Sequence, residues 1–200
     1  MLETVNKLRE IELTDDEGDP VAIENNFWSR GRYQALRERL DALKSEIDTR
    51  SETDMTMERL DDIQREIVEG ETNIQEITSQ SVARVVLSQA RMQAISDIIE
   101  VMEDQHWTVI EKNGVEEIDY AGGETLSDFR EGAFARLRND MGEEVTIVVD
   151  PTDDETQNSL GFHFSGGMFD TDEENERKVL SVTSEIEKSG YKIGKPQCAG

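Results

Sequence analysis

Hydrophobic positions between residues 27 and 104 recur at spacings of three and four, which is the period of an amphipathic helix. This spacing gathers the apolar side chains into one seam along the helix, as in a coiled coil. Because an isolated helix would leave such a seam in water, we expect it to pack on a second helix, either in the same chain or in a second copy. The first series consists of Tyr33, Leu36, Leu40, Leu43 and Ile47.

Two interruptions divide the seam. No apolar residue continues it through residues 49–54, and Gly70 occupies a seam position further along. Side chains able to cap a new helix lie near both places, including Thr72 with Gln75 three residues later. We therefore expect a turn at 49–54 and a softer break near residue 70. The seam resumes in two further series: Met57, Leu60, Ile63, Ile67, Ile74 and Ile77, then Val85, Met92, Ile95, Ile99 and Met102.

Beyond residue 104 the period shortens to two, which is typical of half-buried strands. Asn113-Gly114 separates two runs rich in β-branched and aromatic residues, so we expect a hairpin with a two-residue type I′ turn. Further strands are predicted at 133–138, 145–150 and 160–164. The strongly hydrophobic run 145–150 is expected in the middle of the sheet. All links between strands are too short for a parallel crossover.

Elements at the two ends complete the pattern. The N-terminal segment combines a short amphipathic stretch with a polar run that contains Gly18 and Pro20, which indicates a short helix followed by a loop. A final helix is expected to begin near Thr171 or Asp172, because acids occupy its first turns and bases its later ones, as the helix dipole favours.

Together these elements predict an α+β fold. An N-terminal helical hairpin or coiled coil is followed by an antiparallel meander sheet of about five strands flanked by helices. The expected parts are a short helix and loop at 1–26, the coiled coil or helical hairpin at 27–81, and the α+β sheet domain at 82–200.

Charge and composition restrict the classes of partner. The 200 residues contain 46 Asp and Glu against 21 Lys and Arg, a formal net charge of −25. Because contacts with phosphate need Lys and Arg, we expect no nonspecific binding to nucleic acid or to an anionic membrane surface. No apolar run is long enough to cross a bilayer, and the N-terminus has no features of a secretion signal, so we expect a cytoplasmic protein. The single cysteine, Cys198, cannot form a disulfide within the chain.

One short segment reverses the acidic trend with four arginines: Arg30, Arg32, Arg37 and Arg39. Arginines near the start of a helix oppose its dipole, so we expect a compensating contact. One possibility is pairing with carboxylates of the hairpin partner, such as Glu58, Asp61, Asp62 and Glu66. Because Trp, Tyr and Arg dominate the energetics of interfaces, the other possibility is a protein-binding site formed by Phe27, Trp28, Arg30, Arg32, Tyr33 and Arg37.

Few residues offer catalytic chemistry. The two histidines are His106, expected at the end of a helix, and His163, expected on the polar face of a strand. The carboxylates of residues 150–155 could gather a divalent cation, but their spacing does not match an EF-hand. One cysteine and two histidines are too few for a structural zinc site. We therefore expect no catalytic residue, no metal and no cofactor.

Three functions are compatible with these features. We favour a non-enzymatic accessory or scaffold subunit that self-associates through its coiled coil, as a homodimer or higher oligomer, and docks onto a larger cytoplasmic protein complex. The first alternative is an acidic inhibitor that mimics nucleic acid and occupies the basic groove of another protein. The second is a weak metal-dependent enzyme that uses the carboxylates of 150–155 with His163.

Overall fold

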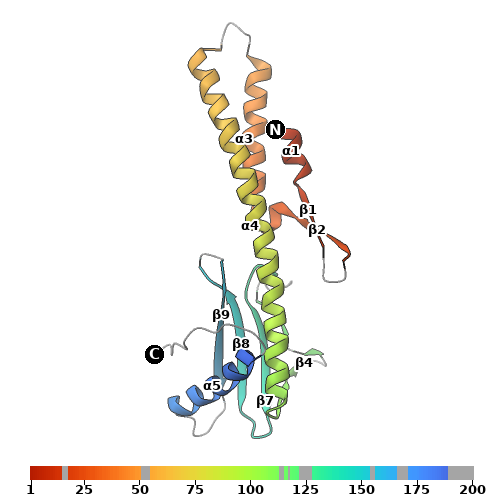
Figure 1. Ribbon diagram of the computed structural model, residues 1–200, viewed down its shortest axis with the longest axis vertical. Helices are drawn as coiled ribbons and strands as arrows, with labels where there is room; N and C mark the ends of the chain where they lie inside the picture. Colours follow the sequence, from red (N-terminus) through yellow and green to blue (C-terminus); the bar gives the residue numbers. More distant parts are fainter. Residues whose placement is uncertain are drawn as a thin grey trace. The chain divides into compact units, whose positions relative to one another are not determined.

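The computed structural model describes residues 1–14, 18–50, 55–112, 115–116, 118–121, 128–153, 156–165 and 171–188 (Figure 1). The chain divides into two compact units, Met1–Val85 and Val86–Gly200. The longest helix, α4 (Met57–Glu103), contributes its N-terminal part to the first unit and its C-terminal part to the second. The α+β class expected from the sequence is confirmed.

The first unit contains a helical hairpin. Helix α3 (Arg32–Thr49) lies beside the first part of α4 (Figure 1), and the short helix α1 (Leu2–Lys7) packs on α3. The helix is interrupted after Thr49 as expected, although the expected turn itself includes residues 51–54, which lie outside the described residues. Ile47, Met57 and Leu60 of the predicted seam are exposed, whereas the rest of it is packed within the same chain by Val5, Tyr33, Leu36, Leu40, Leu43, Ile63, Ile74 and Ile77.

The break expected near residue 70 is wrong, because α4 continues through it without interruption. Gly70 is a point of close approach between elements: a side chain there would meet the end of Met1 and the Leu40 side chain, which would lie 3.3 Å away. Thr72 does not cap a new helix. Its hydroxyl donates to the Val68 carbonyl oxygen within α4, at 3.3 Å.

A β-hairpin replaces the loop that was expected in the N-terminal segment. Strands β1 (Glu10–Thr14) and β2 (Pro20–Glu24) pair antiparallel, with Ile11 opposite Ile23. Their apolar side chains pack against Trp28 and Val85. Apolar and polar residues alternate in β1, which is typical of a strand. The charged stretch that follows made this segment look like a loop.

Helix α2 (Asn25–Trp28) is held in place by one buried amide. The Asn25 side chain is 0% exposed; it donates to the Leu8 carbonyl at 3.0 Å and to the Thr78 hydroxyl at 3.2 Å, and it accepts from the Ser81 hydroxyl at 2.7 Å. The Asn25 backbone N–H also donates to the Arg9 carbonyl at 2.9 Å. This residue therefore joins the N-terminal segment, α2 and α4 within the first unit.

The second unit contains a five-stranded antiparallel sheet with the order β3-β7-β8-β9 and with β6 also paired to β7. Strand β8 lies between β7 and β9, so the expectation for 145–150 is confirmed. The two short strands β4 and β5 pair with each other in a separate ribbon, while the turn at 113–114 lies outside the described residues. The strands are β3 (Trp107–Val109), β4 (Glu111–Lys112), β5 (Val115–Glu116), β6 (Ile118–Tyr120), β7 (Ala133–Asn139), β8 (Glu144–Pro151) and β9 (Asn158–Ser165).

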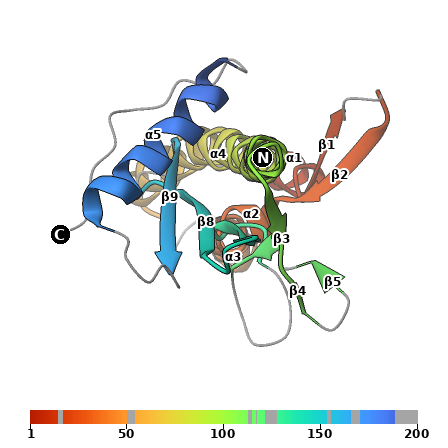
Figure 2. The same ribbon diagram turned by 90° about the horizontal axis from the view of Figure 1, so that it is seen from below.

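One face of this sheet forms the core of the second unit. Helix α5 (Asp172–Lys188) lies next to β9 (Figures 1 and 2), and both α4 and α5 pack on the same apolar face. A capping box opens α5, since Thr171 and Glu174 exchange hydrogen bonds between their side chains and backbone N–H groups. The core contains Ile95, Ile98, Met102, Trp107, Ala133, Ala135, Leu137, Val145, Ile147, Val149, Val182 and Ile186.

Replacing Asn25 tests its role in the first unit. Asn25→Leu leaves the Leu8 carbonyl and the Ser81 hydroxyl without their partner, so we expect the free energy of unfolding to fall by about 1–3 kcal/mol. Urea denaturation in a Trp107→Phe background measures it, because the fluorescence of Trp28 then reports on the first unit alone. The exposed control Asn6→Ala should change the value by less than about 0.5 kcal/mol, and an equally small effect of Asn25→Leu would contradict the prediction.

Candidate functional site

The arginine-rich segment forms a sharp corner between α2 and α3. Arg30 and Gly31 have φ angles of 53° and 84°, so both lie in the left-handed region where the chain changes direction. Ser29 supports the corner, because its buried hydroxyl accepts from the Tyr33 backbone N–H at 3.1 Å. We call the segment that carries Phe27, Arg30, Arg32 and Arg37 the arginine corner; Arg30 and Arg32 are exposed, and Phe27 and Arg37 are half-buried.

Two of the aromatic residues predicted to bind a partner face inward. Trp28 is 9% exposed and packs with Ile23 and Val85, and Phe27 meets its ring edge to face at 5.4 Å. Tyr33 is 2% exposed, and its hydroxyl donates to the Val5 carbonyl at 2.8 Å. Trp28 and Tyr33 therefore hold the corner in place, while Phe27 remains half-buried at its surface.

Burial raises the pKa of the Tyr33 hydroxyl, and the nearby guanidinium groups of Arg37 and Arg9 oppose that rise. Arg9 was not among the residues singled out from the sequence. Its proximity to Tyr33 adds a further positive charge beside the arginine corner.

Carboxylates of α4 meet two of the four arginines, as one of the two sequence-based possibilities expects. Arg32 pairs with Glu76 at 3.3 Å and also donates to the Gln80 side chain. Arg39 pairs with Glu66 at 3.3 Å and with Glu69 at 3.5 Å. Glu66 is thus the one acid named in advance that meets one of these arginines in the described interactions.

Arg37 pairs within its own helix, with Asp41 at 3.8 Å. The Arg37 side chain is 40% exposed, and the Arg32 side chain is 44% exposed. Ion pairs with this exposure are weak, so both cations remain available to a second protein.

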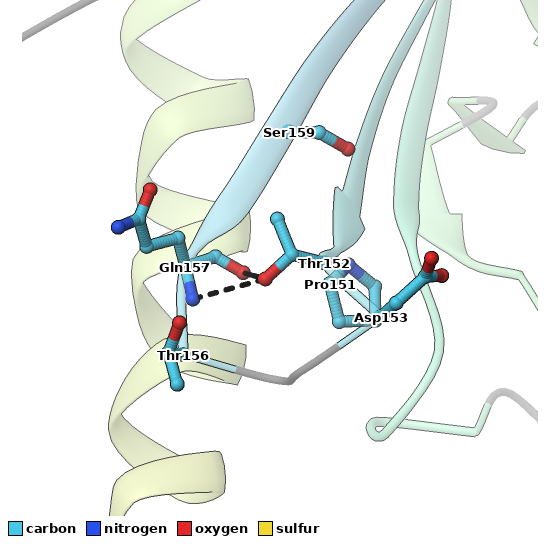
Figure 3. Close-up of a pocket in the computed structure, with 6 residues that line it drawn as sticks. All are labelled: Pro151, Thr152, Asp153, Thr156, Gln157 and Ser159. Carbon is cyan, nitrogen blue, oxygen red and sulfur yellow. Dashed lines mark hydrogen bonds between the residues drawn. The ribbon is translucent and has the colours of Figure 1, made fainter.

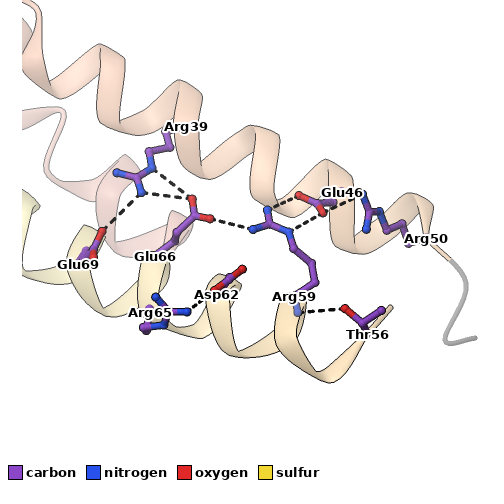
Figure 4. Close-up of polar contacts among 9 residues, drawn as sticks. All are labelled: Arg39, Glu46, Arg50, Thr56, Arg59, Asp62, Arg65, Glu66 and Glu69. Atoms are coloured by element: carbon purple, nitrogen blue, oxygen red, sulfur yellow. Dashed lines mark hydrogen bonds and ion pairs between the residues drawn. The ribbon is translucent and has the colours of Figure 1, made fainter. Parts of the chain in front are cut away.

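A chain of ion pairs crosses the hairpin further toward its tip (Figure 4). Arg59 on α4 donates to Glu46 on α3 at 2.6 Å and to Glu66 at 3.1 Å, and Glu66 continues the chain to Arg39. The hydrogen bond from Arg59 is the largest cause of the lowered pKa of Glu46. The same bond raises the pKa of the Arg59 guanidinium, so both groups stay charged at neutral pH.

This chain predicts a pH dependence. Because the folded-state pKa of Glu46 is lowered, its stabilisation is present at neutral pH and is lost as the pH falls through that pKa. We expect Glu46→Gln to be less stable than the wild type at pH 7, with the difference shrinking as the pH falls below the ordinary pKa of a glutamate side chain. Thermal unfolding of both proteins across this range measures it. Asp48→Asn, on the same helix, serves as the control, and a difference that persists unchanged at low pH would contradict the assignment.

The histidines and the acidic stretch 150–155 belong to the second unit, whereas the arginine corner belongs to the first. His163 is exposed on β9 opposite Thr146, and His106 is exposed after the end of α4 with φ of 66°. Of the acidic stretch 150–155, Asp154 and Glu155 lie outside the described residues. Among the residues the structure describes, no three or more His, Cys, Asp or Glu are arranged to hold a metal ion.

A shallow hollow lies at the loop that joins β8 to β9 (Figure 3). The Thr152 hydroxyl donates to the Gln157 carbonyl at 3.0 Å and accepts from the Gln157 backbone N–H at 3.2 Å. These bonds close the loop on itself. The lining residues are Pro151, Thr152, Asp153, Thr156, Gln157 and Ser159, so Asp153 is the one carboxylate among them.

Asp150 packs against Gly132 at the neighbouring strand. A side chain at position 132 would overlap the Asp150 carboxylate and lie 3.3 Å from the Val149 carbonyl oxygen. We expect Gly132→Ala to lower the free energy of unfolding by about 1–3 kcal/mol, and to cost less in an Asp150→Ser background. A double-mutant cycle of urea denaturation measures the coupling. The same cost in both backgrounds would contradict this contact.

Polar residues inside the second unit were missed by the sequence reasoning. Ser88 is buried on α4 and exchanges hydrogen bonds with Tyr120, at 3.1 Å and 3.0 Å. Arg91 is 2% exposed; it donates to the Asn158 side chain at 3.0 Å and to the Phe129 carbonyl at 3.1 Å. Their position in the sequence could have identified them, because each places a polar side chain within the apolar stripe of α4.

Comparison with models of protein families gave no match for this sequence, and neither a search of curated proteins nor one of solved structures returned a match. Within the described ranges, no helix combines the length and the apolar character needed to span a bilayer.

Proposed function

We propose that this chain is a non-enzymatic accessory or scaffold subunit, which docks through its arginine corner onto a larger protein in the cytoplasm and self-associates. The observation that carries the proposal is the arginine corner itself. A buried framework of Asn25, Trp28 and Tyr33 presents partly exposed cations and one aromatic ring on a chain of net charge −25.

The chemistry of the corner indicates the kind of partner. Arginine combines a charge with a flat apolar surface and is enriched in interface hot spots, as are aromatic residues. Phe27 is half-buried beside Arg30, so it offers an apolar anchor next to positive charge. The matching surface is an apolar pocket with an acidic rim.

The surface that we propose for self-association differs from the one expected from the sequence. Of the seam residues of α3, Tyr33, Leu36, Leu40 and Leu43 are buried within the same unit, and Ile47 is 44% exposed. A second copy would have to displace these contacts to use the seam. We therefore propose that self-association uses another surface.

Photocrosslinking in the source organism tests the docking. A photoreactive phenylalanine analogue replaces Phe27, and in a matched chain it replaces Leu180, an exposed residue of α5. We expect a covalent adduct with a larger protein from position 27 alone. Removing two cations with Arg30→Ser and Arg37→Ser should reduce its yield at least about tenfold.

Two results would overturn the docking proposal. One is no adduct from position 27, and the other is the same adducts at equal yield from both positions. A basic partner recovered with undiminished yield after the Arg30→Ser and Arg37→Ser changes would instead support the acidic, nucleic-acid-mimicking inhibitor.

A further inference from the structure

The sheet of the second unit has one face packed on helices and one face that is not buried. Residues of β7 and β8 alternate strictly: Ala135 and Ile147 are 0% exposed, whereas their sequence neighbours on the opposite side are partly or fully exposed. No described residue on that opposite side of β7, β8 or β9 is buried. We call it the open face.

Cross-strand pairing arranges the open face in rows that change character along the strands. One end is basic, the middle is apolar and the other end is acidic. In order, the rows are Arg138 with Glu144 and Ser165, Arg136 with Thr146 and His163, Phe134 with Val148 and Gly161, and Asp150 with Ser159.

The charges at the two ends are opposite in sign. At the basic end, the described charged residues of the face are Arg136, Arg138 and Glu144, and Glu144 pairs with both arginines, with Arg136 at 3.3 Å. At the other end Asp150 is exposed, and Asp119 lies beside the apolar row through its pairing with Phe134. Such an arrangement is complementary to its own copy turned by 180° about an axis that lies between the two faces and runs across the strands.

We infer that the open face is the surface through which two copies of this chain associate. In a two-fold dimer each contact occurs twice, so the basic end of one copy lies over the acidic end of the other. Two sheets packed in this way lie about 10 Å apart, and the apolar row of each copy then faces the row of Arg136, Thr146 and His163 in the other. The inference rests on the proposed function, because it names the surface for the self-association proposed there.

The charge of the whole chain favours this surface over most others. Two copies of a chain with net charge −25 repel each other, although salt at physiological strength screens charges beyond about 8 Å. Electrostatic repulsion between two copies is therefore weakest at a surface where cations balance the carboxylates. The two arginines of the open face supply that balance.

The size of the open face predicts a weak dimer. At about 4.8 Å per strand and about 3.3 Å per residue, four strands of width and eight residues of length cover about 20 by 25 Å. The two copies together then bury about 1,000 Å², which is at the lower limit for specific interfaces. We expect a reversible dimer with a dissociation constant in the micromolar range.

Mixing two charge-reversed variants of the full chain tests the geometry. Arg138→Glu places acid opposite acid, and Asp150→Arg places base opposite base, so each alone should raise the dissociation constant at least about tenfold. An equimolar mixture should form heterodimers with nearly the wild-type dissociation constant, because every such contact again joins opposite charges. Sedimentation velocity over a range of concentrations measures all three samples.

Two controls accompany the mixture. Arg65→Glu makes the same charge change on the first unit, at a side chain that is 72% exposed, and should leave the dissociation constant unchanged. Ser159→Arg, in the same row as Asp150, places a cation at the acidic end if Asp150→Arg fails to fold.

The possible outcomes are distinct. A wild-type chain that stays monomeric at several hundred micromolar overturns both this inference and the proposed self-association. A dimer that the open-face variants weaken no more than Arg65→Glu does, or that the mixture fails to restore, overturns the open face alone. Neither outcome bears on docking through the arginine corner, which the crosslinking measures separately.

Discussion

One constraint organises both units: α4 carries a stripe of inward-facing side chains along its length, and that stripe cannot remain in water. In the first unit α3, α1 and the β1–β2 hairpin cover it, with Ile74, Ile77 and Val85 as buried members. In the second unit the sheet and α5 cover its continuation, with Ile95 and Ile98. The position of each other element within its unit therefore depends on the part of α4 that it covers.

Polar residues within the stripe fix the register of the elements that pack on α4. Ser81 meets the buried amide of Asn25 in the first unit, and Ser88 and Arg91 meet Tyr120 and Asn158 in the second. A purely apolar stripe would tolerate sliding of the packed elements. A buried donor or acceptor that loses its partner costs about 1–3 kcal/mol, so each of these contacts opposes a shift in register.

Hydrophobic periodicity was enough to predict the elements whose apolar residues face the core and whose polar residues face solvent. The hairpin of α3 and α4, the central position of β8 and the start of α5 all follow from spacing and capping chemistry in the sequence. The continuity of α4 through Gly70 could not be predicted in this way, because the glycine is explained by contacts with Met1 and Leu40, which are distant in sequence. The inward orientation of Trp28 and Tyr33 likewise depends on tertiary contacts, so composition alone made the arginine-rich segment look more exposed than it is.

The central claim is that the buried part of the helical seam is packed within one chain, so that self-association has to use another surface. The most direct test is isotope-filtered nuclear Overhauser spectroscopy on an equimolar mixture of labelled and unlabelled chains. It observes contacts between the methyl groups of Leu36, Leu40 and Leu43 and those of Ile63, Ile74 and Ile77. The account predicts these contacts within labelled chains and none between labelled and unlabelled chains. Strong contacts between chains at these methyl groups would contradict it.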